Sequence, residues 1–181
     1  QVAYPGNKHA ESFNDQMERM REQIKAAEQA QALQDGLAPG APAPEISLPK
    51  PNGEILNLSD LRGQVVLVDF WAAWCRPCRM TNPKLVEVYN KYKDRGFTIY
   101  SVSFDGLANQ QTPKDDWLKA IEQDKLVWDN HVSDLKGWSS AAGRAYGIQS
   151  IPFTVLVDKN GNIVQKQVSP DQLGLLLESI L

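Results

Sequence analysis

The chain has 181 residues, of which 42% are hydrophobic and 23% charged, and its formal net charge is −3 at pH 7. These values are typical of a soluble globular protein and exclude a strongly basic surface built to bind nucleic acid. The longest apolar run, Val65 to Phe70, contains Asp69 and is far shorter than the roughly 20 residues that a membrane-spanning helix needs.

The N-terminal region predicts a helix with a single apolar stripe. From about Ala10 to Gly36 the sequence is rich in Gln, Glu and Ala. Apolar residues recur there at alternating spacings of four and three, at Phe13, Met17, Met20, Ile24 and Ala27. This stripe fits a helix that folds back on the rest of the chain or serves as a spacer. It also fits a short coiled-coil seam through which two copies associate.

The chain divides into three segments by composition. We expect an N-terminal helical extension over residues 1–37, a linker rich in Pro and Ala over residues 38–44, and an α/β domain over residues 45–181. The chain begins at Gln1, and we expect that a preceding segment, such as a signal or a lipid anchor, has been removed.

Strands and helices alternate from residue 45 onward. The first half of the domain predicts a β-hairpin around Pro51-Asn52-Gly53, a buried strand at Val65–Phe70, a helix from the cysteine pair to about Asp94, and a strand at Phe97–Phe104. The second half predicts an inserted helix from Thr112-Pro113, a short helix at Ser139–Tyr146, a hairpin of Phe153–Asp158 with Asn162–Val168, and a last helix after Ser169-Pro170. This order predicts a central mixed sheet flanked by helices.

The two cysteines of the chain, Cys75 and Cys78, stand three positions apart. A disulfide between them closes so short a loop that it stabilises the fold little, so we interpret the pair as a site of thiol–disulfide exchange. The start of a helix stabilises a thiolate, and Arg76 adds a positive charge. We therefore expect Cys75 to be the exposed nucleophile and Cys78 the resolving thiol, with Pro77 stiffening the turn between them.

Two other uses of the cysteine pair are weaker. A structural zinc site needs four ligands, and beyond the cysteines only His9 and His131 offer imidazoles, neither at a ligand-like spacing. A peroxidatic cysteine would not need a partner three residues away. We therefore expect no metal and no bound cofactor.

Asp69 and the tryptophans complete the candidate site. A carboxylate inside an apolar strand is costly when ionised, so we expect a raised pKa at Asp69. Trp74 is expected to shield Cys75 and shape the contact surface, and Trp71 to serve mainly in packing. The tryptophans outside the motif are expected in the core: Trp117, Trp128 and Trp138.

The segment from Val68 to Met80 closely resembles the active-site segment of thioredoxins, and Ser150-Ile151-Pro152-Phe153-Thr154 resembles the cis-proline loop of that family. The wider layout from about Ala41 to Leu181 resembles the TlpA/ResA branch of bacterial envelope thioredoxins. The resemblance implies a thioredoxin fold with an N-terminal hairpin and an inserted helix. It also implies that Pro152 is cis, that the backbone of Ile151 pairs with substrate, and that Asp69 moves the Cys78 proton.

The leading hypothesis is a thiol–disulfide oxidoreductase of the bacterial envelope or periplasm that reduces protein disulfides through a Cys75/Cys78 cycle. By resemblance, its partners are protein substrates, with cytochrome c precursors among the candidates, and a membrane protein that donates electrons. One alternative is an oxidant of the same fold, similar to DsbA. The other is a binding or scaffold module that works through its N-terminal helix.

Overall fold

The computed structural model describes residues 8–181, except for the side chains of residues 8–12, 14 and 34. Its α-helices are α1 Lys8–Gly36, α2 Arg76–Tyr92, α3 Pro113–Gln123, α4 Ala141–Ala145 and α5 Pro170–Ile180. Its strands are β1 Ser47–Pro49, β2 Ile55–Asn57, β3 Val65–Trp71, β4 Phe97–Ser103, β5 His131–Val132, β6 Phe153–Val157 and β7 Ile163–Lys166. Single 3₁₀ turns lie at Leu58–Leu61, Lys93–Arg95 and Gly137–Ser139.

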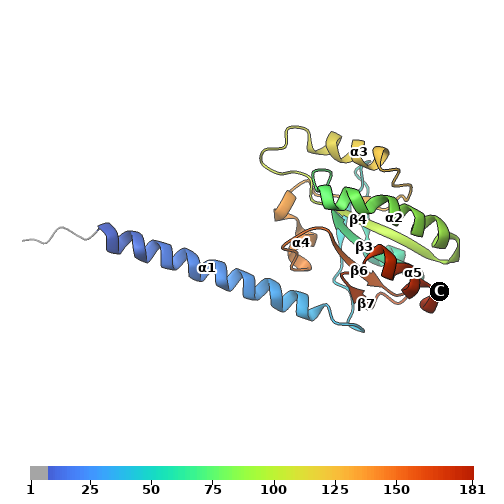
Figure 1. The fold of residues 1–181 in the computed structure, drawn as a ribbon, viewed down its shortest axis with the longest axis horizontal. Helices are drawn as coiled ribbons and strands as arrows, with labels where there is room; N and C mark the ends of the chain where they lie inside the picture. The colour runs from blue at the N-terminus through green and yellow to red at the C-terminus, as the bar shows by residue number, and fades with distance from the viewer. Residues whose placement is uncertain (1–7) are drawn as a thin grey trace, which may run out of the picture.

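The described residues form a five-stranded mixed sheet in the order β5-β4-β3-β6-β7, and a separate hairpin of β1 and β2 (Figure 1). Strand β3 lies at the centre and is buried along its whole length, which explains its continuous apolar run. It runs parallel to β4 and antiparallel to β6. In this register Asp69 lies between Ser101 of β4 and Thr154 of β6.

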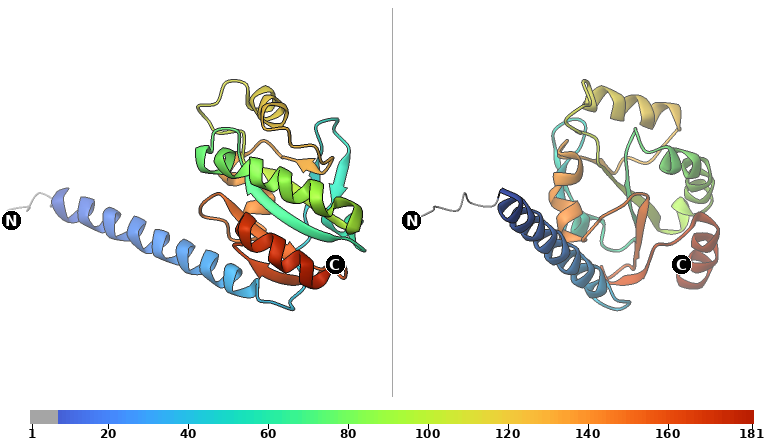
Figure 2. Two further views of the ribbon diagram at one scale, coloured as in Figure 1. Left: turned by 45° about the vertical axis from the view of Figure 1, so that its right-hand side comes forward. Right: turned by 60° about the vertical axis from the view of Figure 1, so that its left-hand side comes forward.

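Helices and the hairpin cover the two faces of the sheet (Figure 2). On one face α2 packs against β4 and α5, whose start is fixed by a capping box between Ser169 and Gln172. On the other face the ring of Phe70 contacts those of Phe104, Tyr146 and Phe153. Successive residues of a strand point to opposite faces, so Asp69 faces the α2 side while Phe70 faces the other.

The predicted elements occur in the predicted order, with two local differences. Strand β5 is only two residues long, too short to show an alternating pattern, and the sequence did not predict it. Thr112 occupies the N-cap position of α3, but its hydroxyl contacts the side chain of Asp116 (3.1 Å) instead of a helix N–H.

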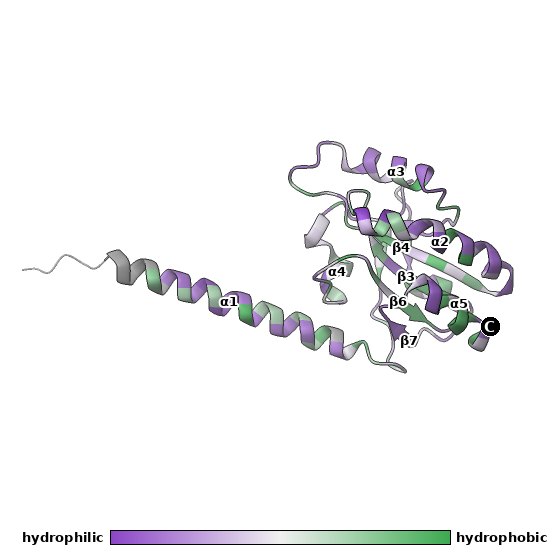
Figure 3. Cartoon of the chain, in the orientation of Figure 1, coloured by the Kyte–Doolittle hydropathy of each residue, from purple (hydrophilic) through white to green (hydrophobic). Residues whose placement is uncertain are grey.

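Helix α1 extends away from the domain (Figures 1 and 2), so the interpretation of a helix folded back on the domain is wrong. Its C-terminal end touches the domain: a Cβ at Gly147 would lie 2.5 Å from the carbonyl oxygen of Ala30, and Leu37 is buried. Further out, Phe13 is 62% exposed and Ile24 52% exposed. Apolar and polar residues alternate along the helix (Figure 3), and no helix among the described residues has the length and apolar character to cross a membrane.

Candidate active site

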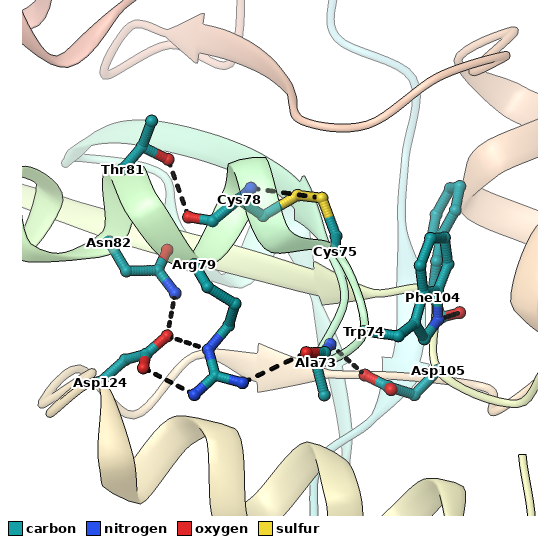
Figure 4. The surroundings of a disulfide bond; sticks show 10 residues. All are labelled: Ala73, Trp74, Cys75, Cys78, Arg79, Thr81, Asn82, Phe104, Asp105 and Asp124. Atoms are coloured by element: carbon teal, nitrogen blue, oxygen red, sulfur yellow. Dashed lines mark hydrogen bonds and ion pairs between the residues drawn. A yellow bond between two sulfur atoms is a disulfide. The ribbon is translucent and has the colours of Figure 1, made fainter.

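The two cysteines form a disulfide at the start of α2, with an S–S distance of 2.05 Å (Figure 4). Cys75 is the N-cap residue of the helix, and its Sγ accepts a hydrogen bond from the backbone N–H of Cys78 (3.3 Å). Pro77 lies in the first turn, where the missing N–H costs no helical hydrogen bond. The site therefore places one sulfur at the positive end of the helix dipole.

The surroundings of the disulfide are unevenly exposed. Cys75 and Cys78 are both buried, with Cys75 slightly more accessible, at 4% against 1%. The neighbouring side chains Arg76 and Pro77 are exposed, and Trp74 is 37% exposed. Cys75 was predicted to be exposed, and this prediction is wrong for the disulfide form, because its Sγ is bonded to Cys78 and accepts the Cys78 N–H at the start of the helix.

Asp69 is buried behind the disulfide-bearing helix. It lines a cavity of about 290 Å³ together with Thr81, one turn after Cys78, and with Pro152 and Thr154. Among residues 8–181, no hydrogen bond or ion pair reaches its carboxyl group, and burial raises its pKa from 3.8 to about 7. The predicted rise is confirmed, and an acid with this pKa gains and loses protons near neutral pH.

The peptide bond between Ile151 and Pro152 is cis, as the resemblance implied. Pro152 is exposed and borders the same cavity as Asp69. Within the described part of the chain, no backbone hydrogen bond of Ile151 is found. Its N–H and C=O are therefore free to pair with an extended peptide.

Two side chains that the sequence analysis did not select hold the loop before the disulfide (Figure 4). The backbone N–H of Ala73 donates to Asp105 (3.0 Å), and the carbonyl of Ala73 accepts from Arg79 (3.2 Å). Asp105 is fully buried and also accepts from Ser103 (2.6 Å) and Gln110 (2.7 Å). Sequence reasoning did not select Asp105, because its contact with Ala73 joins loops that are distant in the sequence.

Arg79 also joins α2 to the end of α3. Its guanidinium forms a bidentate ion pair with Asp124, and it donates to Gln123 (3.0 Å). Asp124 in turn accepts from Asn82 (2.6 Å). Because bidentate pairs fix geometry, this network orients the first two turns of the redox helix against the inserted helix.

The burial of the tryptophan side chains agrees with the prediction except at one position. Trp71, Trp117 and Trp128 are buried, as expected. Trp138 was predicted in the core, but it is 45% exposed, so this prediction is wrong. It lies beside Trp74, with ring centroids 5.9 Å apart, because the loop that carries it folds over the end of β4.

No metal centre is visible in the described residues: they contain no group of three or more His, Cys, Asp or Glu side chains that could hold an ion. His131 is buried and stacked on Trp128, and desolvation lowers its pKa to about 4. It is therefore neutral at pH 7 and belongs to the core beside β4.

Comparison with known proteins agrees with this geometry. The model of the AhpC/TSA family matches residues 39–166. The thiol–disulfide oxidoreductase ResA of Oceanobacillus iheyensis is 32% identical over 151 residues, which cover 78% of this chain and 72% of that protein.

Solved structures give the same result. The thioredoxin domain of a thiol–disulfide oxidoreductase from Bacteroides vulgatus is 41% identical and superposes with a TM-score of 0.69, covering 78% of this chain and 96% of that one. A thiol:disulfide interchange protein from Bacteroides sp. is 40% identical with a TM-score of 0.68, covering 80% and 90%. The predicted thioredoxin fold and the predicted class of activity are confirmed.

Proposed function

The chain belongs to the AhpC/TSA family and is a thiol–disulfide oxidoreductase, and from this premise we propose that it reduces disulfides in proteins of the bacterial cell envelope. The observation that carries the proposal is the Cys75–Cys78 disulfide at the N-terminus of α2, with the carboxyl of Asp69 buried behind that helix.

In the first step the Cys75 thiolate attacks one sulfur of the substrate disulfide. A bond forms between Cys75 and that sulfur, and the other substrate sulfur leaves as a thiolate and takes up a proton. The position of Cys75 at the helix N-cap favours the anionic form of the attacking sulfur, since backbone N–H groups and the helix dipole stabilise negative charge there.

In the second step Cys78 releases the substrate. Asp69, in its ionised form, accepts the proton of the Cys78 thiol, and the resulting thiolate attacks the sulfur of Cys75. The second substrate sulfur leaves as a thiolate and takes up a proton, and the protein keeps the disulfide. Two electrons pass from the two cysteines to the substrate, so the cycle needs no bound cofactor, only a dithiol donor that restores the reduced pair.

The substrate strand is held beside the disulfide by the loop that contains the cis peptide bond. The free backbone groups of Ile151 support pairing with an extended substrate segment, and Pro152 borders the cavity that Asp69 lines. Protein disulfides, including those of cytochrome c precursors, are the proposed substrates. A membrane protein that carries electrons across the bilayer is the proposed donor.

A trapping experiment tests this cycle. With Cys78→Ser the second step is blocked, so envelope proteins should accumulate as mixed disulfides on Cys75 and separate on reduction. The matched control, Cys75→Ser with Cys78→Ser, should trap none. If the Cys78→Ser protein reacts with a small thiol reagent but traps no envelope protein, the proposed class of substrate is wrong.

A further inference from the structure

Trp138 lies on the surface beside the redox disulfide. Its ring stands edge-on to Phe104, with centroids 5.4 Å apart and planes at 82°, and contacts the ring of Trp74, the residue next to Cys75. Trp138 is 45% exposed and Trp74 37% exposed, whereas Trp117 is 2% exposed. The sequence pattern placed Trp138 in the core, and the function described above does not use it.

The exposure of these two rings is unfavourable in the free protein. Removing apolar surface from water contributes about 25 cal/mol per Å², and two neighbouring half-exposed indoles forgo part of that gain. Adjacent exposed aromatic side chains are typical of binding surfaces, where tryptophan is enriched among the residues that dominate affinity. This ledge, defined by Trp74 and Trp138 over the buried ring of Phe104, adjoins the sulfur that every substrate must reach.

The ledge is rigid. The indole N–H of Trp74 donates to the carbonyl of Phe104 (3.1 Å), which fixes its ring. The loop that carries Trp138 is fixed to the end of β4, because the N–H of Gly137 donates to the carbonyl of Asp105 (3.1 Å). At Gly106 the same loop approaches so closely that a Cβ would lie 2.0 Å from the carbonyl oxygen of Leu135. Binding on a surface held in this way costs little ordering entropy.

The position of the ledge determines what it can bind. A polypeptide bonded through its cysteine to Cys75 must pass beside Trp74, and successive residues of that polypeptide are 3.8 Å apart at Cα, so side chains next to the cysteine come within reach of the rings. Aromatic pairs with centroids about 4.5–7 Å apart attract each other beyond the gain from burial alone. A small thiol compound has no such side chain to offer.

We propose that Trp138 and Trp74 form a specificity subsite that binds an aromatic or large apolar side chain adjacent to the reactive cysteine of a polypeptide substrate. This inference rests on the proposed reduction of protein disulfides. Trp138 takes no part in the electron transfer, so its contribution is to the choice of substrate.

Three mixed disulfides with nitrothiobenzoate test the proposal. Two are short peptides that differ only in having Phe or Ala on both sides of the cysteine, and the third is N-acetylcysteine. The Cys75 thiolate bonds to the cysteine sulfur, the coloured nitrothiobenzoate leaves with the electron pair, and Cys78 then frees the peptide thiol. The protein is reduced and freed of reductant beforehand, so each molecule reacts once, and the dependence of the rate of colour release on the concentration of the compound gives the single-turnover equivalents of kcat/KM and KM.

The wild-type protein should reduce the Phe peptide about tenfold faster than the Ala peptide, mainly through KM. Trp138→Ala should remove most of this preference, and Trp138→Phe should restore most of it. Leu175→Ala, which removes another exposed apolar side chain on α5, should leave the ratio as in the wild type.

The proposal is overturned if the wild type shows no preference, or if Trp138→Ala lowers the rates for both peptides equally, because a merely structural role would act in that way. Failure to reduce N-acetylcysteine nitrothiobenzoate at all would instead overturn the proposed function, and this subsite with it. The two failures are therefore distinguishable.

Discussion

The carboxylate of Asp105 accepts a hydrogen bond from the backbone N–H of Ala73 (3.0 Å). This bond connects the end of β4 to the loop that leads to the disulfide. Arg79 holds the carbonyl of the same residue (3.2 Å), so Ala73 is fixed at both its backbone groups. Because Ala73 stands two residues before Cys75, this clamp fixes the backbone that leads into the helix N-cap.

Replacing Asp105 should destabilise the protein and slow the redox cycle. Asp105→Ala leaves the Ala73 N–H and the Ser103 hydroxyl without their acceptor in a buried site, which costs about 1–3 kcal/mol. Urea denaturation measures this loss. Asp115→Ala, which removes an exposed carboxylate from the first turn of α3, is the control and should change stability by less than about 0.5 kcal/mol. Equal effects of the two changes would rule out the clamp.

The ion pair of Arg79 with Asp124 should be worth more than an exposed pair elsewhere on α2. Its side chains are 26% and 13% exposed, whereas those of Lys84 and Asp171 are 59% and 80% exposed. A double-mutant cycle to Ala should give a coupling of about 1 kcal/mol or more for the first pair, and less than about 0.5 kcal/mol for the second. A coupling of the first pair as small as that of the second would contradict the proposed role in orienting α2.

Asp69 should make the stability of the oxidised protein depend on pH. Its folded-state pKa of about 7 lies above the value of 3.8 for an unperturbed carboxyl, so the folded protein keeps a proton that the unfolded chain releases. Its contribution is therefore fully present below about pH 4 and is lost as the pH rises to about 7, by up to about 4 kcal/mol.

Asp69→Asn isolates this contribution, because every other titrating group is shared with the wild type. The variant should gain stability relative to the wild type between about pH 4 and pH 8, as measured by urea denaturation of both oxidised proteins. A stability difference that does not change across this range would mean that the carboxyl is not desolvated in the folded state.

The sequence was sufficient for the parts of the site that lie within one continuous segment. Cys75 and Cys78 share a helix start, and Asp69 interrupts an apolar strand just before it, so both features could be recognised from local pattern. Asp105 and Trp138 could not, because their roles depend on the loops after β3, β4 and β5 meeting in space. Gly106 is a local sign of that close approach. The reason for the glycine is seen only in the structure, where a Cβ at this position would clash with the backbone of Leu135.

The direction of helix α1 could not be predicted for a similar reason. An apolar stripe has the same spacing whether it packs on its own domain, on a second copy or on nothing. The structure shows the stripe largely exposed, with Met20 47% and Ile24 52% accessible, and association of two copies through it stays a prediction.

The reduction potential of the Cys75–Cys78 pair tests the central claim most directly. Equilibration with a thiol buffer of known potential, followed by quantification of reduced and oxidised protein, gives this value. A protein that reduces substrate disulfides should have a reduction potential close to that of thioredoxin, which is about −270 mV. A reduction potential close to that of the oxidant DsbA, which is about −120 mV, would contradict the proposed direction of electron flow.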